Sequence, residues 1–397
     1  MATKLAKRKG RVKTKALSGA KRGRKAVVTA KRGRPAKAKP RRAKAAKPRK
    51  AKAAKAVAKR GAPPEHEAML GLISGFWCSQ IIYTAVTLGV PDALGKDALT
   101  AEALAERAEA HPGHLRRLLR ALVSLQILAE DRQGRFRLTK LGRTLRGDDK
   151  ASLRNLVLML VDDWNWDAWK ALPYGVKTGE PIFEHVKGMP AFDYLRQYPD
   201  KERVFAASMA SISATQNDAI ARAYPFDGLT RLVDVGGAHG HLLAAVLGKA
   251  KKLKGVLYDQ PQVVEAAGES GFLSAPRIAK RVEIVGGSFF DSVPEGADGY
   301  MMKYIIHDWD DEKCVRILQN CRDAMAPKGR VLVIDKVLKG GNAPDFGPLM
   351  DINMMVIPNG QERTKEEFAA LFERAGLKLK RIHPTETQLS IIEAVQA

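Results

Sequence analysis

The sequence contains few cysteines and few aromatic residues, and one long stretch of it has no acidic residue at all. Three cysteines among 397 residues (Cys78, Cys314 and Cys321) are too few for a disulfide framework. We therefore expect free thiols in a reducing compartment, with Cys314 and Cys321, seven positions apart, on one packed helical face. No apolar run follows the basic N-terminus as it does in a secretory signal, so the sequence predicts a cytoplasmic protein.

Acidic residues are absent from positions 1–60, which hold 26 of the 68 Lys and Arg residues. The rest of the chain is nearly neutral, with 42 basic and 43 acidic residues. Residues 1–62 also contain no aromatic residue, so they cannot bury a core and are expected to form a disordered basic tail.

Within this tail, the segment 31–35 (Lys-Arg-Gly-Arg-Pro) resembles the core of an AT-hook, whose arginines lie in the minor groove of A·T-rich DNA. Arg32 and Arg34 are therefore candidate nucleic-acid contacts, since a narrow minor groove attracts arginine. The alternative, which we favour, is a generic polycation that binds nucleic acid without sequence preference through counterion release. Either reading predicts nucleic-acid contact and association with the nucleoid, unless translation starts near Met69 and the tail is absent.

No charged residue occurs from Met69 to Val90, a length that could cross a membrane. The stretch nevertheless contains Ser74, Gln80 and Thr84, together with three glycines. We therefore favour a buried or dimer-interface helix over a membrane helix.

Residues 63–150 are predicted to form a small helical domain. Thr100 can cap a helix that has Glu102 in its first turn, and leucines from 115 to 125 recur at helical spacing. Residues 135–139 then alternate as a short strand, and helix, helix and strand in this order are the outline of a winged helix. The arginines at 116, 117 and 120 could face DNA or could form an ordinary solvated face.

Residues 151–230 are predicted to be a helical linker, in which Trp164, Trp166 and Trp169 are clustered. Residues 231–397 alternate between strand and helix patterns. Strands are expected at 232–235, 255–258, 282–285, 299–303 and 331–336. This alternation predicts an α/β domain with a parallel, Rossmann-like sheet and helices on both faces.

The first of these strands runs into a glycine-rich turn, Leu232-Val-Asp-Val-Gly-Gly-Ala-His-Gly240. Its three glycines let the backbone turn tightly and approach a ligand. Such a turn at the carboxyl end of a first strand binds nucleotide-like ligands in α/β sheets, although glycine turns also serve purely structural purposes.

Acidic residues and one histidine follow the later strands. Asp259 ends the second strand, where a carboxylate can accept hydrogen bonds from ribose hydroxyls. His307 follows the fourth strand, Asp335 ends the fifth, and Glu362 lies in a polar turn. A carboxylate bonded to one imidazole nitrogen raises the basicity of the other, so these residues predict a general base.

These motifs, in this order, resemble the S-adenosylmethionine-dependent O-methyltransferases of the caffeic acid and hydroxyindole O-methyltransferase family, and bacterial secondary-metabolite enzymes most of all. The resemblance covers about residues 70–395 and rests on 234–240, on Lys303 with His307-Asp-Trp-Asp-Asp-Glu312, and on Glu362-Arg-Thr364. It implies S-adenosylmethionine as the cofactor and a winged-helix domain that serves dimerisation and not DNA reading, which speaks against DNA contacts by Arg116 and Arg117. A homodimer that uses 69–90 as its surface would follow.

The resemblance also implies roles for individual residues. His307 would be the general base, flanked by Asp335 and Glu362. The cofactor would be bound by Asp234, Gly236, Gly240, Asp259, Ser288, Phe289 and Lys303. Two departures stand out. Ser288 replaces the acid that usually holds the adenine amino group, and Asp335 is one methylene shorter than the usual Glu, so its contact with His307 is expected to be looser.

The reaction implied is methyl transfer to a phenolic or enolic hydroxyl of a small molecule, without a metal, since His239 and His241 lack further ligands. The walls of the substrate pocket are expected from Trp164, Trp169, Phe183, Met209 and Met355. Two alternatives stay open, a DNA-associated regulator that has kept the fold and a nucleic-acid methyltransferase. The complete set of base residues speaks against the first, and the lack of a segment that would grip a flipped base speaks against the second.

Overall fold

The computed structural model describes residues 64–149, 152–269 and 271–397. Arg32, Arg34 and the basic tail as a whole lie outside the described residues, so the predictions made for them are not addressed by the fold.

The N-terminal part of the described chain is a small helical domain with a β-hairpin. Its elements are α2 (Glu65–Ile73), α3 (Gly75–Thr87), α4 (Val90–Leu94), α5 (Ala101–Arg107), α6 (Pro112–Ser124), β1 (Leu128–Glu130), β2 (Phe136–Leu138) and α7 (Lys140–Arg143). Thr100 caps α5 as predicted, because its side chain accepts a hydrogen bond from the Ala103 N–H. β1 and β2 pair antiparallel, and Phe136 also bridges to Leu99. These elements have the predicted winged-helix order, with β1 as a strand that the sequence pattern did not predict.

The uncharged segment 69–90 is divided among α2, α3 and α4, with a bend of 41° between the first two helices. No single helix of the described ranges is long and apolar enough to span a membrane. The bent pair of α2 and α3, taken together, has a length and a composition that would allow it. Several large apolar side chains of this pair are at least half exposed: Met69, Leu70, Leu72, Ile73, Phe76 and Trp77. We call these six residues the apolar surface of α2 and α3.

The segment that follows is helical, as predicted. It contains α8 (Arg154–Leu160), α9 (Asp163–Lys170), α10 (Leu172–Thr178), α11 (Ile182–Lys187), α12 (Ala191–Gln197) and the long α13 (Pro199–Ala223). α13 packs against α8 at one end and against the first helix of the sheet domain at the other. It therefore delivers side chains from the linker to the edge of the sheet.

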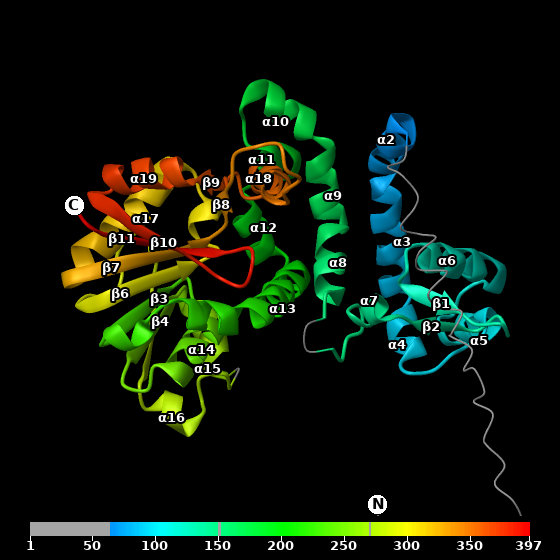
Figure 1. The fold of residues 1–397 in the computed structure, drawn as a ribbon, viewed down its shortest axis with the longest axis horizontal. Helices are drawn as coiled ribbons and strands as arrows, with labels where there is room; N and C mark the ends of the chain where they lie inside the picture. The colour runs from blue at the N-terminus through cyan, green and yellow to red at the C-terminus, as the bar shows by residue number, and fades with distance from the viewer. Residues whose placement is uncertain (1–63, 150–151, 270) are drawn as a thin grey trace, which may run out of the picture. The chain divides into compact units, whose positions relative to one another are not determined.

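A seven-stranded sheet forms the centre of the C-terminal domain (Figure 1). Its strands are β3 (Arg231–Val235), β4 (Lys254–Asp259), β5 (Val282–Gly286), β6 (Ala297–Lys303), β7 (Met325–Asp335), β10 (Leu377–Pro384) and β11 (Ser390–Gln396). The order across the sheet is β10-β11-β7-β6-β3-β4-β5. β3 to β7 are parallel, so all five predicted strands are present and their carboxyl ends meet at one edge.

The sheet is mostly parallel, as predicted, and its last two strands, which the sequence pattern did not predict, are antiparallel. β11 pairs antiparallel with β7, and β10 pairs antiparallel with β11. The connection between β10 and β11 is short, and short connections join antiparallel strands. A parallel pair would need a longer crossover, usually a helix. Residues 377–380 of β10 alternate between leucine and lysine, which is a usable signal for a half-buried strand, but the alternation is short and ends at Lys380 and Arg381, where the pairing with β11 shifts register.

Helices cover both faces of the sheet, as predicted, because successive strand residues point to opposite sides. On one face, Leu232, Leu257 and Met301 pack with α13 and with α14 (His241–Lys249). On the other face, Val233 and Val256 pack with α17 (Asp311–Ala324) and α19 (Lys365–Arg374). Figure 1 shows α17 and α19 on one side of the sheet and α14 and α15 (Pro261–Glu269) on the other.

The remaining short elements lie around this sheet. They are η1 (Phe226–Gly228), α16 (Pro276–Ala279), η2 (Ile306–Asp308), β8 (Val337–Leu338), α18 (Gly347–Val356) and β9 (Arg363–Thr364). Cys314 and Cys321 are both buried on α17, so the predicted shared packed face is confirmed, and all three thiols are free.

Candidate active site

The glycine turn joins β3 to α14 and brings the backbone close to neighbouring side chains. Gly236 has φ +69°, and a Cβ added there would lie 2.4 Å from Ile305 Cδ1. Gly240 has φ +77°, and a Cβ there would lie 2.7 Å from Leu273 Cδ1. A side chain at either position would be strained and would clash, so both positions require glycine.

Asp234, which is buried, and Lys303, which is partly buried, carry opposite charges beside this turn and influence each other through their charges. Asp234 is only 2% exposed, and its Oδ2 has no hydrogen-bond partner among the described residues. Burial raises the pKa of Asp234 to about 7, against the opposing effect of Lys303. Burial likewise lowers the pKa of Lys303 to about 8. The Lys303 ammonium donates hydrogen bonds to Ser213 Oγ (2.7 Å) and Asn217 Oδ1 (2.8 Å), both on α13.

Asp259 ends β4 at the same edge of the sheet. Its carboxylate accepts hydrogen bonds from the N–H groups of Ala238 (2.8 Å) and Gln260 (2.7 Å). Burial raises the pKa of Asp259 despite these two donors. Ser288 follows β5, and its hydroxyl accepts a hydrogen bond from the Phe290 N–H at 3.3 Å. The ring of Phe289 approaches Gly236, since the added Cβ would lie 3.7 Å from its Cε1.

These features fit a cofactor that has an ammonium group at one end and a ribose farther along. The buried Oδ2 of Asp234, which has no partner among the described residues, can receive a cationic or donor group without losing another bond. The turn at Gly236 leaves no room for a side chain but allows a ligand to lie against the backbone. Asp259 stands where a carboxylate accepts ribose hydroxyls in sheets of this kind. The residues present therefore fit S-adenosylmethionine.

His307 lies in η2, directly after β6, and contacts two acids. Its Nδ1 is 2.9 Å from Glu362 Oε1, and its Nε2 is 3.5 Å from Asp308 Oδ1. Both His307 and Glu362 are buried. Glu362 is fixed from behind, because its backbone N–H donates to Asp351 Oδ1 at 2.8 Å, while its Oε2 has no partner within the described ranges. A carboxylate on Nδ1 holds the imidazole so that Nε2 can take a proton.

The charges around His307 favour a proton on the imidazole. Burial opposes the charged form, but the carboxylates of Asp308, Asp335 and Glu362 outweigh it and raise the pKa of His307 to about 10. Burial raises the pKa of Asp335 to about 7 and that of Asp308 to about 6. The imidazole and the carboxylates of Asp335 and Asp308 therefore have raised pKa values, and that of the imidazole is the highest of the three.

Asp335 acts on His307 through its charge and is bonded to a different group. It is fully buried at the end of β7, and its Oδ1 accepts a hydrogen bond from the Tyr304 N–H at 3.0 Å. Its Oδ2 lacks a partner in the described part of the chain. The expectation that Asp335 orients the imidazole by direct contact remains a prediction, and the observed bond ties Asp335 to the backbone at Tyr304.

Tyr304 links His307 to Lys303 and to α13. Its ring is stacked on His307, with centroids 5.1 Å apart and planes at 24°. Its hydroxyl exchanges hydrogen bonds with the Gln216 side chain on α13, and the Lys303 ammonium lies 5.6 Å from its ring centroid. Tyr304 has φ +59°, which is uncommon for an aromatic residue and is held by these surrounding contacts.

The five residues expected to line a substrate pocket are placed unequally. Trp164 and Phe183 are almost fully buried and pack edge-to-face in an apolar cluster, with ring centroids 5.8 Å apart. Met209 on α13 and Met355 on α18 are partly buried against the same cluster. Trp169 is 36% exposed. The structure thus brings four of the five together and leaves Trp169 at the surface.

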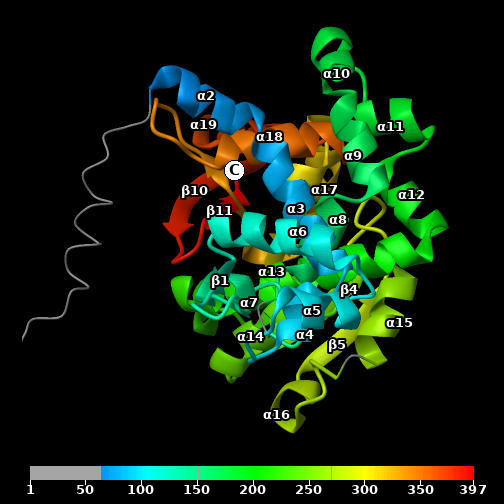
Figure 2. The ribbon, with the colours of Figure 1, turned by 90° about the vertical axis from the view of Figure 1, so that its right-hand side faces the viewer.

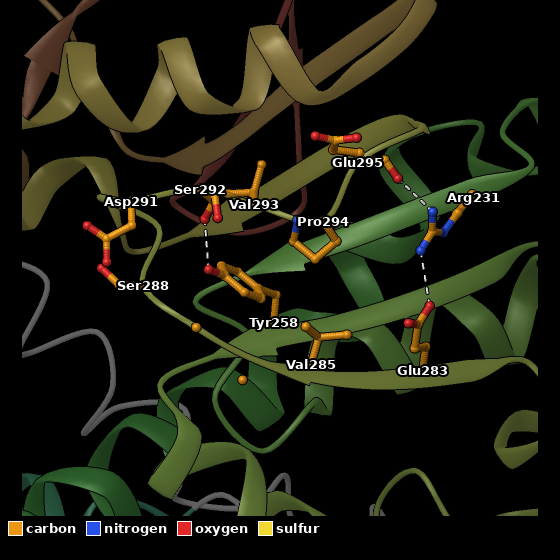
Figure 3. A pocket seen from close by; sticks show the side chains of 12 residues that line it. Arg231, Tyr258, Glu283, Val285, Ser288, Asp291, Ser292, Val293, Pro294 and Glu295 are labelled. Carbon is orange, nitrogen blue, oxygen red and sulfur yellow. Dashed lines mark hydrogen bonds and ion pairs between the residues drawn. The ribbon is translucent and has the colours of Figure 1, made fainter.

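A separate cavity of about 560 Å³ opens beside β5 (Figure 3). It is lined by Ser288 and Asp291 at one end and by Arg231, Glu283 and Glu295 at the other. Tyr258 spans it and donates a hydrogen bond to the Ser292 carbonyl at 2.7 Å. Its walls include no residue of the His307 cluster, so it is not the centre of the chemistry.

A metal centre does not emerge from the described residues, where no group of three or more His, Cys, Asp and Glu side chains is arranged to hold an ion. His241 stacks on Phe272, with ring centroids 3.8 Å apart, and burial lowers its pKa. His239 and His241 thus lie side by side on the turn without a ligand set around them.

Sequence reasoning missed four residues that complete the site. Asp308 adjoins His307 in the chain, and an acid next to a candidate base was a usable signal. Tyr304 adjoins Lys303, but its stacking follows from a left-handed backbone conformation that no local pattern predicts. Ser213 and Asn217 hold Lys303 from about 90 residues away in sequence, and only the fold brings them together.

Comparisons with known proteins agree with this geometry. An O-methyltransferase domain model matches residues 169–378, and an O-methyltransferase dimerisation domain model matches residues 70–148. A phenazine O-methyltransferase from Lysobacter antibioticus is 36% identical over 336 residues, which are 85% of this chain and 98% of the relative. A phenazine-1-carboxylate N-methyltransferase from Pseudomonas aeruginosa is 30% identical over 329 residues, 83% of this chain and 97% of the relative.

Solved structures share the whole described fold. The crystal structure of LaPhzM has a TM-score of 0.79 at 35% identity and covers 84% of this chain and all of its own. An O-methyltransferase from neocarzinostatin biosynthesis, solved with S-adenosyl-L-homocysteine and 1,4-dihydroxy-2-naphthoic acid, has a TM-score of 0.69 at 32% identity, over 81% of this chain and 96% of its own. A chain that matches both domain models and aligns with such enzymes along nearly their full length belongs to the family of S-adenosylmethionine-dependent O-methyltransferases.

Proposed function

We propose that this enzyme transfers a methyl group from S-adenosylmethionine to a phenolic or enolic hydroxyl of a small molecule, with His307 as general base. The observation that carries the proposal is the buried His307–Glu362 pair at 2.9 Å, which lies at the edge of the sheet where the glycine turn and Asp234 also end. When bound, the cofactor supplies a methyl group on a sulfonium, which is already activated and needs no metal.

The basicity of His307 suits a hydroxyl of phenolic acidity. An ordinary imidazole has a pKa of about 6.5 and a phenol one of about 10, so proton transfer between them would cost about 5 kcal/mol. A pKa of about 10 for His307 removes most of that cost. General-base assistance of this kind is worth about 10²- to 10⁴-fold in rate.

The acids around His307 have two roles in this proposal. Glu362 bonds Nδ1. This bond fixes the tautomer and the orientation of the imidazole, so that Nε2 is directed toward the substrate. Asp335 and Asp308 stabilise the imidazolium that forms when the proton arrives, through charge rather than through a bond to Nδ1. Loss of any one of the three would lower the basicity of His307.

We assign cofactor binding to the seven residues expected from the sequence. Asp234 and Gly236 would hold the methionine end, Asp259 the ribose, and Ser288 with Phe289 the adenine side. Gly240 begins α14, and Lys303 balances the charge of Asp234. Ser288 offers only a hydroxyl to the adenine amino group, and this hydroxyl already accepts the Phe290 N–H, so we expect weaker retention of the adenine end than an acid would give.

A small aromatic substrate is supported by the aromatic character of the cluster near α18. Trp164, Phe183, Met209 and Met355 would form one wall, with Trp169 at its outer rim. Some relatives are named as N-methyltransferases, and amines are therefore the competing acceptors. Hydroxyls are favoured because a strongly basic imidazole is of use only to an acceptor that must lose a proton as it attacks.

The enzyme is proposed to act as a homodimer. The chain carries a dimerisation domain, and the apolar surface of α2 and α3 belongs to it. Exposed apolar patches of this kind mark interaction sites. The division of the chain near residues 62, 150 and 230 into tail, dimerisation domain, linker and methyltransferase domain is part of the same proposal.

The basic tail is proposed to bind nucleic acid without sequence preference, through its 26 Lys and Arg residues in 60 positions. Arg32 and Arg34 would be among the contacts. This implies a cytoplasmic enzyme that its tail holds at the nucleoid.

The direct test offers labelled S-adenosylmethionine to the full-length protein with a panel of phenols and aromatic amines and, separately, with DNA and RNA. We expect the phenols to become labelled. Demethylation of the product should then release the label, because an O-methyl group carries it. Label only in the amines would replace a hydroxyl acceptor with a nitrogen acceptor. Label only in nucleic acid would overturn the proposal, and binding of cofactor without transfer to any acceptor would favour a regulator.

A further inference from the structure

We propose that duplex DNA docks on the winged-helix domain, on a basic face formed by α6, the β1–β2 hairpin and α7. We define this basic face by six residues, Arg117, Arg120, Arg132, Arg137, Lys140 and Arg143. The proposal extends the nucleic-acid contact proposed for the tail by naming a second, folded surface and the form of nucleic acid that it fits.

The elements have the arrangement that places a helix into a DNA groove. α5 and α6 are joined by a four-residue turn (108–111), and the β1–β2 hairpin follows α6 as a wing. The wing turn adjoins α6, because a Cβ added at Gly134 would lie 3.9 Å from Arg116 Nη2. Figure 2 shows α6 beside β1, and the two elements are in contact. In helix-turn-helix proteins the second helix enters the major groove.

The arginines of α6 point away from the core of the domain. Leu115, Leu119 and Leu122 are the buried face of the helix. Arg117 and Arg120 are exposed and, three positions apart, share the outer face. On β2, Phe136 and Leu138 are buried, so the intervening Arg137 points outward and is exposed.

Charge on this domain is concentrated and is largely unpaired. Residues 110–146 contain nine Lys and Arg and two acidic residues, Glu130 and Asp131, in a body that is otherwise slightly acidic. Three of the nine basic residues have an acidic partner: Arg116 pairs with Glu102, Arg135 with Asp131 and Arg146 with Asp148. The six residues of the basic face have no ion pair to any of the described residues, and all are exposed.

A polyanion gains most from cations that have no partner to give up. Each Lys or Arg that neutralises a phosphate releases a condensed counterion, which favours binding. Duplex DNA fits better than RNA, because the major groove of B-form DNA admits an α-helix whereas that of A-form RNA is deep and narrow. Glu130 is exposed on the hairpin and would face the same polyanion unfavourably, but six cations outweigh it.

Two further observations point to the same partner. The 26 cations of residues 1–60 directly precede this domain in the sequence, so DNA bound by the tail would be tethered to the chain that carries the basic face. The basic face also shares no residue with the apolar surface of α2 and α3, and a dimer formed there would offer two such faces.

The test measures binding of a labelled, mixed-sequence duplex of about two helical turns by fluorescence anisotropy, with the full-length protein between about 50 and 200 mM salt. One variant combines Arg117→Gln, Arg120→Gln and Arg137→Gln. The matched control combines Lys251→Gln, Lys252→Gln and Lys254→Gln, which removes three exposed charges from the methyltransferase domain. Methyl transfer to a phenolic acceptor is measured for both, and we expect it to be unchanged.

We expect the slope of log Kobs against log salt to become shallower by about 3 in the winged-helix variant, at about 0.9 per lost phosphate contact, and to stay unchanged in the control. A wild-type slope in the winged-helix variant would overturn the basic face and leave the tail as the only contact. Equal losses in both variants would also overturn it, as would a loss confined to single-stranded RNA. Absence of any duplex binding by the wild-type protein would overturn the tail and the basic face together.

Discussion

Replacing Glu362 with Gln tests how His307 acquires its basicity. The carboxylate lies 2.9 Å from Nδ1 and is buried, and with Asp308 and Asp335 it raises the pKa of His307 to about 10 from the ordinary 6.5. A single opposite charge at this distance shifts a pKa by about 1–3 units. The amide keeps the size of the side chain and can accept a hydrogen bond from Nδ1, but it carries no charge. We therefore expect the pKa of His307 to fall by at least about one unit.

The sign of the effect on activity follows from proton counting. The reacting pair is neutral imidazole with phenol or, equally, imidazolium with phenolate, and either has one proton fewer than imidazolium with phenol. The activity of the wild-type enzyme should therefore rise with pH toward about 10. In Glu362→Gln the acidic limb should move to lower pH, while the plateau falls about tenfold because a weaker base takes the proton less readily.

The assay is single-turnover methyl transfer from labelled cofactor to one phenol, measured across the pH range. The ionisation of that phenol is common to all variants, so differences between the limbs report the enzyme. Glu373→Gln removes an exposed carboxylate from α19, the helix that follows Glu362 in the chain, and should reproduce the wild-type curve. An acidic limb at the same pH in Glu362→Gln and the wild-type enzyme would refute the electrostatic origin of the basicity of His307.

Three further predictions concern the cofactor, the base and the dimer. Asp234→Asn should weaken cofactor binding at least tenfold in calorimetry, because a charge-assisted bond is lost. Burial raises the pKa of Asp234 from 3.8 to about 7, so ionisation of this carboxyl lowers the free energy of unfolding. The loss reaches about 4 kcal/mol above pH 7 and is absent below pH 4. The variant should therefore gain melting temperature relative to wild type at pH 8 and less at pH 5. Tyr304→Leu should lower kcat about tenfold without changing cofactor affinity, by removing the ring stacked on His307, whereas Tyr304→Phe should retain most activity. Leu70→Glu with Trp77→Glu should convert the dimer to a monomer in light scattering, because charges would replace the exposed apolar side chains.

Local sequence patterns were sufficient for much of this fold. The cap at Thr100, the leucine stripe of α6 and the five parallel strands each follow from short-range spacing, and each is present. The edge of the sheet could be predicted as well, because the carboxyl ends of parallel strands meet there. Asp234, Asp259 and His307 were therefore expected at one site from their positions in the chain alone.

What could not be predicted depends on contacts between distant segments. Lys303 is held by Ser213 and Asn217 on α13, a helix whose contact with the sheet has no local signature. Asp335 is bonded to the backbone of Tyr304, a geometry that depends on a left-handed residue. The strand β10 was missed because its apolar–charged alternation covers only residues 377–380 and breaks at Arg381, and tertiary pairing with β11 decides the conformation of the rest.

Single-turnover methyl transfer by His307→Ala, compared with wild type at saturating cofactor and phenol, tests the central claim most directly. The variant should bind S-adenosylmethionine with unchanged affinity, since His307 contacts Glu362 and Tyr304 rather than the glycine turn. Its rate should fall by about 10²- to 10⁴-fold, the range of general-base assistance. Full turnover by a variant that binds the cofactor normally would contradict the assignment of His307 as the base.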